Sequence, residues 1–336
     1  MKYTCLLRPH ANGRYQEASV PLALSEVRLL AEKADRKIEP EIRTELGVQW
    51  ITFECDALDE KGVSEISRSA HVYLLSEAHE NGLMKPLQSS EEAFLGDDLP
   101  YILKYKGKTN ETFTKYIVNL ALCASDFSGD ERLKLLDPMC GRGTTLFEAV
   151  NRGWDALGTD VQAADVDEAG KFFKKYLEYH RFKHTVSKKS MTAKGKEAAV
   201  MQVIEFAKDN QAFKSGGART FRTAVLDSSK ISALGVKKEF HIIATDLPYG
   251  VQHGPGGVKG KSLEQMVRDV LPAWREALVP GGAMALSFNT NTLKLDFVRR
   301  AMEEAGLRPM VGAGYDGLAH WVEQAITRDV AVAVKV

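Results

Sequence analysis

The sequence predicts an α/β protein in which a doubly wound sheet follows a smaller α+β domain. From residue 104 onward, short apolar segments alternate with longer segments of helical periodicity, which favours parallel strands joined by right-handed helical crossovers. The first 95 residues lack this alternation. A chain of 336 residues also exceeds the usual size of one hydrophobic core, so we expect about two domains.

The N-terminal segment, residues 1–95, has the pattern of a small α+β domain. Strands are expected at residues 3–7, 48–53 and 71–75, where β-branched, aromatic or alternating apolar residues gather. A helix is expected over about residues 60–69. The stretch from 89 to 100 is acidic and contains Gly and Pro, so we place the boundary within it and assign residues 96–336 to the second domain.

The second domain is predicted to alternate strands with helices. We expect strands at residues 133–137, 155–160, 220–226, 240–245, 283–288 and 330–334, and helices at 144–151, 165–182, 262–277 and 294–305. A Lys-, Ser- and Ala-rich insertion at about 184–217 interrupts this pattern. We expect no sheet strand in it, and one amphipathic helix over residues 196–208.

Charge is unevenly distributed along a chain whose formal net charge is zero. Residues 1–100 contain 11 Lys and Arg against 18 Asp and Glu, whereas residues 171–222 contain 13 basic and 4 acidic side chains. A basic stretch beside an acidic domain suits a polyanionic partner, bound at one face only. The alternative is a solvated, Lys-rich helix face without a partner.

Other sequence features narrow the class of protein. The cysteines are far apart and show no Cys-x-x-Cys spacing, so we expect free thiols at Cys5, Cys55, Cys123 and Cys140. No His and carboxylate set has a metal-binding spacing, and we expect no metal. There is no apolar run of about 18 residues and no signal-peptide pattern, so we expect a cytoplasmic protein without a membrane span.

A glycine-containing turn between the strand at 133–137 and the helix at 144–151 is the candidate cofactor loop. Small residues let the backbone approach a ligand, and the helix N-terminus offers free N–H groups and a positive dipole to an anion or carboxylate. The third glycine of a nicotinamide site and the Gly-Lys-Ser/Thr of a P-loop are both absent. The candidate contacts are Asp137, Pro138, Cys140, Gly141, Gly143 and Thr144.

Two further acids follow the next two strands. Asp160 lies about 20 residues past the loop, where a carboxylate accepts hydrogen bonds from ribose hydroxyls. Asp227 ends the following strand and is placed to receive an adenine amino group. Each acid alone also fits a helix cap or a turn, which Asp favours. Three acids after three successive strands favour a nucleoside site.

The candidate catalytic residues are Asp246, Leu247, Pro248 and Tyr249, directly after an apolar strand. An aryl amine is a poor nucleophile because its lone pair is delocalised into the ring, so a site for it must accept hydrogen bonds from its N–H groups. The Asp246 carboxylate and a backbone carbonyl near Leu247 or Pro248 supply two acceptors. Proline fixes the backbone, and Tyr249 offers a face on which a flipped base can stack. The alternative is a proline turn after a buried strand.

The loop and the acids together resemble a known family. Asp-Pro-x-Cys-Gly-x-Gly-Thr at 137–144, followed by Gly-Thr-Asp at 158–160, resembles motif I and the ribose acid of class I, Rossmann-like methyltransferases. The resemblance implies S-adenosylmethionine as cofactor, with its methionine part at the loop, its ribose at Asp160 and its adenine at Asp227. Residues 106–113 resemble the segment that closes over the methionyl carboxylate, which implies contacts from Thr109, Asn110 and Phe113.

The catalytic motif resembles one branch of that family. Asp-Leu-Pro-Tyr-Gly at 246–250 is similar to the motif of THUMP-linked guanosine N2-methyltransferases that act on tRNA. Residues 320–330 resemble the carboxy-terminal hairpin of that branch, and residues 1–95 resemble its N-terminal ferredoxin-like part, although a full THUMP module does not fit. The resemblance implies methylation of guanosine N2 in structured RNA, with tRNA as the leading candidate and residues 171–222 as the RNA contact.

Two other functions remain open at this stage. Zero net charge and an acidic N-terminal domain favour a small-molecule or protein amino-methyltransferase. A non-catalytic cofactor-binding scaffold is the second alternative, against which the intact Asp246 and Tyr249 argue. His253, with Lys259 and Lys261, either closes over a substrate or lies in a solvated loop, and His320 is expected to be structural. A homo-oligomer or a protein partner is compatible with the sequence.

Overall fold

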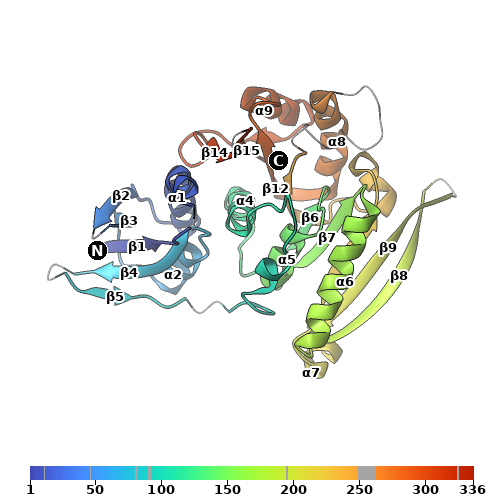
Figure 1. The fold of residues 1–336 in the computed structure, drawn as a ribbon, viewed down its shortest axis with the longest axis horizontal. Helices are drawn as coiled ribbons and strands as arrows, with labels where there is room; N and C mark the ends of the chain where they lie inside the picture. The colour runs from blue at the N-terminus through green and yellow to red at the C-terminus, as the bar shows by residue number, and fades with distance from the viewer. Residues whose placement is uncertain are drawn as a thin grey trace.

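The computed structural model has a small antiparallel sheet at its N-terminus and a large mixed sheet beside it (Figure 1). The structure describes residues 1–10, 12–45, 47–79, 82–89, 92–193, 196–248, 262–323 and 325–336. Within these ranges, no helix is both long and apolar enough to cross a membrane.

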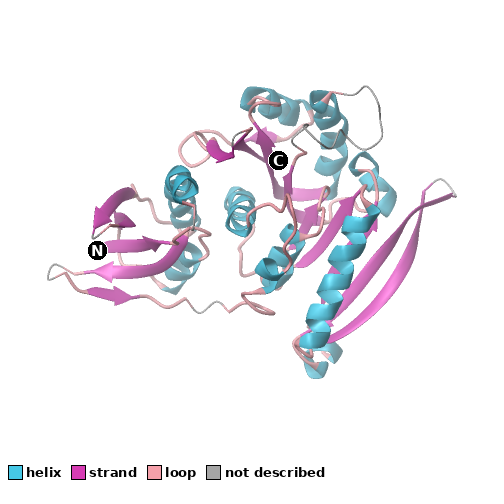
Figure 2. Cartoon of the chain, viewed as in Figure 1, coloured by secondary structure: helices cyan, strands magenta, loops and turns pink. Residues whose placement is uncertain are grey.

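The N-terminal sheet has five strands in the order β2-β3-β1-β4-β5, all antiparallel. They are β1 (Lys2–Leu7), β2 (Glu41–Glu45), β3 (Val48–Glu54), β4 (Val72–Ala78) and β5 (Met84–Pro86). The helices α1 (Gly13–Lys33) and α2 (Glu60–Ser67) cover one face of this sheet (Figure 2). Chain order β-α-β-β-α-β with strands so arranged is the ferredoxin-like arrangement.

Alternation along β1 explains its place in this domain. Tyr3, Cys5 and Leu7 are buried and pack with Ile51 and the apolar face of α1, whereas the residues between them lie on the opposite face. Because successive strand side chains point to opposite faces, one side of the sheet becomes apolar and α1 covers it.

The large sheet has strand order β13-β15-β12-β11-β6-β7-β10-β9-β8, and β14 pairs with β15. Its strands are β6 (Lys134–Asp137), β7 (Asp155–Asp160), β8 (Lys183–Ala193), β9 (Lys196–Ala207), β10 (Arg219–Val225), β11 (Phe240–Asp246), β12 (Leu278–Asn289), β13 (Arg308–Pro309), β14 (His320–Glu323) and β15 (Ile326–Val334). The five strands β12, β11, β6, β7 and β10 are mutually parallel. Their carboxyl ends therefore share one edge.

Helices cover both faces of the large sheet, which confirms the predicted doubly wound α/β class. One core contains α4 (Glu111–Ala124), α5 (Thr144–Asn151) and α6 (Ala163–Tyr179). The other contains α8 (Leu263–Ala277), α9 (Leu295–Glu304) and the 3-10 helix η1 (Ser228–Leu234). The short helices α3 (Leu99–Ile102) and α7 (Asn210–Lys214) lie in connections.

The expected helix over residues 196–208 is wrong, as is the expectation that the insertion adds no strand. β8 and β9 form an antiparallel hairpin that joins the sheet beside β10. Alternation along β9 explains the difference: Met201 and Val203 enter one core, whereas Ile204 and Phe206 enter the other. A strand buried on both faces has a nearly continuous apolar sequence, which periodicity alone does not separate from a helix.

Glu26 of α1 connects the N-terminal domain to the large sheet. It is 1% exposed, and its carboxylate accepts hydrogen bonds from Ser69 Oγ (2.5 Å), Ala70 N–H (3.0 Å) and Asn119 Nδ2 of α4 (2.7 Å). His71 Nδ1 lies 2.8 Å away. Burial alone would raise the pKa of Glu26, but the hydrogen bonds and the adjacent His71 outweigh it and hold the pKa at about 2.

We expect Glu26→Ala to lower the free energy of unfolding by about 3 to 5 kcal/mol, because it leaves several buried donors without an acceptor. The folded-state pKa of Glu26 lies below the ordinary value of 4.5. Its stabilisation is therefore present above that value and is lost as the pH falls toward 2. Denaturant unfolding of wild type and variant across this range measures both effects.

Glu17→Ala, on the exposed side of the same helix, is the matched control and should change stability little. Equal losses in the two variants would show that Glu26 does not connect the domains as described.

Candidate functional site

The loop between β6 and α5 is shaped by two glycines in the left-handed region of backbone space. Gly141 has φ 49° and Gly143, the N-cap of α5, has φ 85°. Side chains other than glycine rarely adopt these angles. The loop therefore turns sharply and presents the first N–H groups of α5 at the carboxyl edge of the sheet.

Asp137 supports this loop from beneath. It is buried, and its Oδ1 accepts hydrogen bonds from Thr245 Oγ1 (2.7 Å) and Met139 N–H (3.1 Å). Burial raises the pKa of Asp137 to about 7. The Pro138 carbonyl accepts a hydrogen bond from Thr159 Oγ1 at 3.1 Å, which ties the loop to β7.

Asp160 holds the other side of the loop. Its Oδ2 accepts a hydrogen bond from Gly141 N–H and its Oδ1 one from Gln162 N–H, both at 2.9 Å. The structure thus brings the loop and Asp160 together, as the motif implied. Asp160 is half-buried, so part of its surface faces outward.

Cys140 is a packing residue. A Cβ on Gly158 would lie 2.7 Å from Cys140 Sγ and 2.5 Å from Leu146 Cδ1, so only glycine fits beneath the loop. Burial raises the pKa of the Cys140 thiol well above its usual range. A thiol in this state is not a nucleophile.

Two further residues lie near this loop. Asp227 caps η1, where its Oδ1 accepts hydrogen bonds from Ser229 N–H (2.9 Å) and Ser229 Oγ (2.7 Å). Its place after β10 is at the same sheet edge as Asp160, because Val225 pairs with Asp160. Tyr105, which the sequence did not single out, lies with its hydroxyl 3.4 Å from Thr144 Oγ1.

Asp246, the last residue of β11, is the centre of a polar cluster. Its Oδ1 accepts a hydrogen bond from Ser287 Oγ of β12 at 2.7 Å. Its Oδ2 accepts one from Thr109 Oγ1 at 2.8 Å and one from the Arg328 guanidinium of β15 at 3.2 Å. Sequence reasoning singled out Asp246 as catalytic and Thr109 as a cofactor contact, and it missed Ser287 and Arg328.

The segment before α4 reaches both the N-terminal domain and Asp246. Asn110 caps α4 by accepting a hydrogen bond from Phe113 N–H at 3.2 Å, and its Nδ2 lies 3.3 Å from His10 Nε2. Phe113 is fully buried, with the Arg328 guanidinium carbon 4.9 Å from its ring centre. Phe113 therefore supports the cluster from within the core.

The rest of the catalytic motif is partly described. Leu247 is buried, and its N–H donates to the Ser287 carbonyl at 2.8 Å, so the motif continues the line of β11. Pro248 is half-buried. Tyr249, His253, Lys259 and Lys261 lie outside the described residues.

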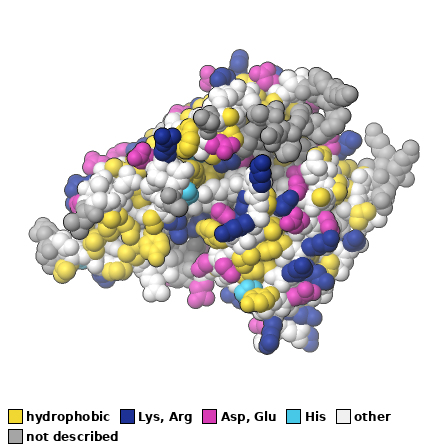
Figure 3. Space-filling view, in the orientation of Figure 1, with side chains coloured by type: hydrophobic (Ala, Val, Ile, Leu, Met, Phe, Trp, Pro, Cys, Tyr) yellow, Lys and Arg dark blue, Asp and Glu magenta, His cyan; other side chains and the backbone are white. Residues whose placement is uncertain are grey.

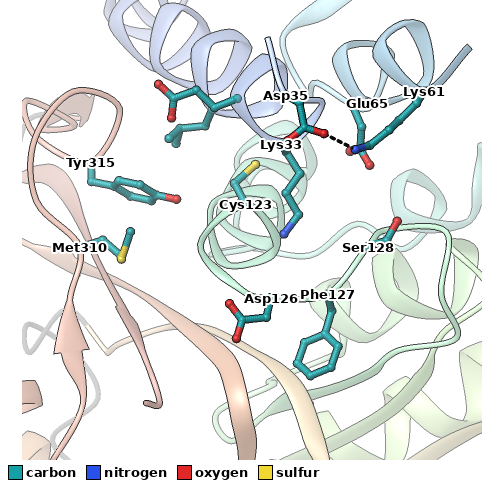
Figure 4. Close-up of a pocket in the computed structure, with 12 residues that line it drawn as sticks. Lys33, Asp35, Lys61, Glu65, Cys123, Asp126, Phe127, Ser128, Met310 and Tyr315 are labelled. Carbon is teal, nitrogen blue, oxygen red and sulfur yellow. Dashed lines mark hydrogen bonds and ion pairs between the residues drawn. The ribbon is translucent and has the colours of Figure 1, made fainter. Parts of the chain in front are cut away.

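A cavity of about 450 Å³ between α1, α2 and the end of α4 is separate from this site (Figure 4). Lys33, Cys123, Asp126 and Tyr315 are among its lining residues. α4 has 14 residues and is about 21 Å long. Thr109 lies just before its first turn and Cys123 in its last, so the cavity and Asp246 are at opposite ends.

Within the described ranges, no group of three or more His, Cys, Asp or Glu side chains is arranged to hold a metal ion. The groups that the structure brings together at this sheet edge are acids, backbone N–H groups, hydroxyls and the Arg328 guanidinium. Such a donor set fits an organic ligand with ribose hydroxyls and a carboxylate.

Comparison with known proteins identifies the family. The sequence model described as "RMKL-like, methyltransferase domain" matches residues 104–313. No curated protein matches the sequence.

Several solved structures are similar in fold. A TehB-like SAM-dependent methyltransferase from Corynebacterium glutamicum is 21% identical, with 67% of this chain and 97% of that chain covered and a TM-score of 0.35. TrmN from Thermus thermophilus is 15% identical, with 90% of this chain and 60% of that chain covered and a TM-score of 0.42. Magnesium protoporphyrin IX methyltransferase from Synechocystis, with bound SAM, is 12% identical, with 67% of this chain and 79% of that chain covered and a TM-score of 0.41.

The family match covers more than half of the chain and includes the glycine loop, Asp160 and Asp246. The protein therefore belongs to the RMKL-like methyltransferases, class I enzymes that take their methyl group from S-adenosylmethionine.

Proposed function

We propose that this protein methylates an exocyclic amino nitrogen, that of guanosine N2 in structured RNA, with tRNA as the first candidate. The observation that carries the proposal is the Asp246 cluster at the carboxyl edge of the sheet, beside the glycine loop. A fixed carboxylate followed by a backbone carbonyl provides the two acceptors that an aryl amine needs.

The cofactor assignment rests on the donor set of the same edge. In the proposal, the loop around Gly141 and Gly143 holds the methionine part, Asp160 receives the ribose hydroxyls and Asp227 the adenine amino group. Thr109 and Asn110 stand directly before α4, where Thr109 Oγ1 donates to Asp246 and Asn110 is the N-cap. S-adenosylmethionine supplies an electrophilic methyl group when bound.

The residues of the catalytic motif orient the amine. Asp246 and the carbonyl of Leu247 or Pro248 accept its N–H hydrogens, which turns the lone pair toward the methyl carbon. S-adenosylmethionine would give up its methyl group and leave as S-adenosylhomocysteine, and the amine nitrogen would release one proton to water. Correct placement supplies most of the rate in such transfers.

The hairpin of β8 and β9 supports RNA as the substrate, because it extends past the edge that carries the site. Met201 of β9 pairs with Ala224 near the end of β10. The five residues 196–200 therefore extend about 16 Å beyond that pair. Residues 190–193 of β8 pair with residues 196–200 and project with them, whereas residues 187–189 lie level with the end of β10. We call residues 187–193 with 196–200 the arm (Figure 1).

Lysines on the arm differ from other members of the basic stretch. Lys188 and Lys189 are exposed and point to opposite faces of the arm, since neighbouring strand residues alternate. Lys171 and Lys174 of α6, by contrast, pair with Asp167 and Glu178. Figure 3 shows basic and acidic side chains interspersed over α6. The arm is thus the better candidate for phosphate contacts.

The Asp160→Ala variant tests the cofactor assignment. Asp160→Ala should weaken S-adenosylhomocysteine binding, measured by calorimetry, by about 1 to 3 kcal/mol, because it removes the acceptor for the ribose hydroxyls and the tie to Gly141. Asp167→Ala, an exposed acid on α6, is the control. Undiminished affinity in a folded Asp160 variant would remove this residue from the cofactor site.

The second prediction separates binding from chemistry. Asp246→Ala should retain cofactor affinity and lose methyl transfer by roughly a hundredfold or more, because the amine loses its orienting carboxylate. Transfer of labelled methyl into RNA, protein and metabolites, tested in parallel, measures the rate and identifies the acceptor. Asp296→Ala, exposed at the start of α9, is the control. Parallel loss of cofactor affinity would mean that Asp246 is structural.

The third prediction concerns RNA. Charge reversal at Lys188 and Lys189 should weaken RNA binding and reduce the salt slope by about one for each lysine, because fewer counterions are released. Lys194, outside the described residues, is expected to act with them. Reversal at the exposed Lys2 and Lys37 of the N-terminal domain changes net charge equally and is the control. If wild type shows no salt-dependent RNA association, a small-molecule or protein acceptor becomes the better candidate.

A further inference from the structure

Arg328 is the residue of the Asp246 cluster to which neither the family match nor the sequence analysis assigns a role. The match ends at residue 313, and Arg328 lies beyond it on β15. Its side chain is 6% exposed and its NH2 donates to Asp246 Oδ2 at 3.2 Å. A buried ion pair adds little to the free energy of unfolding, because removing two charges from water costs about as much free energy as their attraction provides. The position of Arg328 therefore points to a role other than stability.

The geometry of the carboxylate suggests that reason. The last torsion of an aspartate is broad, so a carboxylate with contacts on one side only can rotate. Asp246 receives Ser287 Oγ on one oxygen and Thr109 Oγ1 with Arg328 on the other. These donors come from β12, the segment before α4, and β15. Contacts on both oxygens fix the plane of the carboxylate and hence the direction in which it accepts an N–H.

Arg328 is itself held in place. Its guanidinium lies over the ring of Phe113, with 4.9 Å between the guanidinium carbon and the ring centre. Such cation–π contacts restrict and stabilise a guanidinium. In the sheet, Arg328 pairs with Asn289 of β12 and with His320 of β14, so both neighbouring strands set its position.

His320 does not compete with Arg328 for the carboxylate. Burial is the main cause that lowers the pKa of His320 to about 4; the nearby charge of Arg328 acts in the same direction, and the contact with the Leu318 carbonyl acts against it. The imidazole is therefore neutral at pH 7, and the positive charge at this side of the cluster is that of Arg328.

We propose that Arg328 is a positioning residue for methyl transfer, which fixes the orientation of the Asp246 carboxylate toward the acceptor amine. The proposal rests on the proposed function of Asp246 and deepens it. Because Arg328 acts through Asp246, its removal should lower kcat and leave cofactor affinity and the KM for the acceptor nearly unchanged.

The test measures methyl transfer to whichever acceptor the wild type labels. Arg328→Ala should lower kcat about tenfold or more with KM within about twofold, and Arg328→Lys, which lacks the planar fork, should lie between. Millimolar guanidinium should restore part of the activity of Arg328→Ala and none of that of Asp246→Ala. Wild-type kcat in folded Arg328→Ala would overturn the proposal.

Arg132→Ala is the matched control, because Arg132 forms a two-point ion pair with Asp155 at the opposite, amino-terminal edge of the same sheet. It should lower stability without lowering kcat. An equal loss of kcat in Arg132→Ala, with no guanidinium rescue of Arg328→Ala, would show that Arg328 is merely structural and overturn the proposal.

A second measurement separates this proposal from the proposed function. If wild type labels protein or metabolites and not RNA, the RNA substrate is wrong, and Arg328 is tested on that acceptor. If wild type labels nothing, the free energy of unfolding is measured for Arg328→Ala, for Asp246→Asn and for the double variant. Non-additive losses support the pairing of Arg328 with Asp246, and additive losses overturn it.

Discussion

The parallel alignment of β11 with its neighbours is the constraint on which the site depends. Asp246 stands opposite Ser287 because these two strands run side by side in fixed register. A slip of one residue would turn the Asp246 side chain to the other face of the sheet and away from Ser287. The same alignment places the glycine loop and Asp160 at the neighbouring strand ends, so the register of the sheet assembles residues from distant parts of the sequence.

The N-terminal domain reaches this site through α4. Glu26 contacts Asn119 in the middle of that helix, and His10 contacts Asn110 at its N-cap. Asn110 directly follows Thr109, which donates to Asp246. α4 is therefore held from the N-terminal domain at two points along its length. The N-terminal domain is acidic and would repel a polyanion, but it contributes to the site because it holds the segment that contains Thr109 in place.

The basic side chains that lie close together in the sequence do not form one continuous positive surface in the folded protein. The basic stretch 171–222 suggests a single positive surface, but Arg222 pairs with Glu239 and Arg219 donates to the Gly153 carbonyl. Folding thus uses part of the stretch for internal contacts. Lys188 and Lys189 stay exposed on the arm, whose outer residues 190–193 and 196–200 extend past the edge that carries Asp246, because β9 is longer than β10.

Local sequence was sufficient for the α/β class, the helix at 144–151, the glycine loop and the strand that ends at Asp246, because each depends on short-range periodicity or on turn chemistry. It was insufficient for β9, whose residues are apolar on both faces, and the predicted boundary at residue 95 stays a prediction. Local sequence also could not predict which side chains contact Asp246. Ser287 and Arg328 are 41 and 82 residues away from Asp246 in sequence. Only strand pairing across the folded sheet brings them together, because no local pattern records which strand ends will meet.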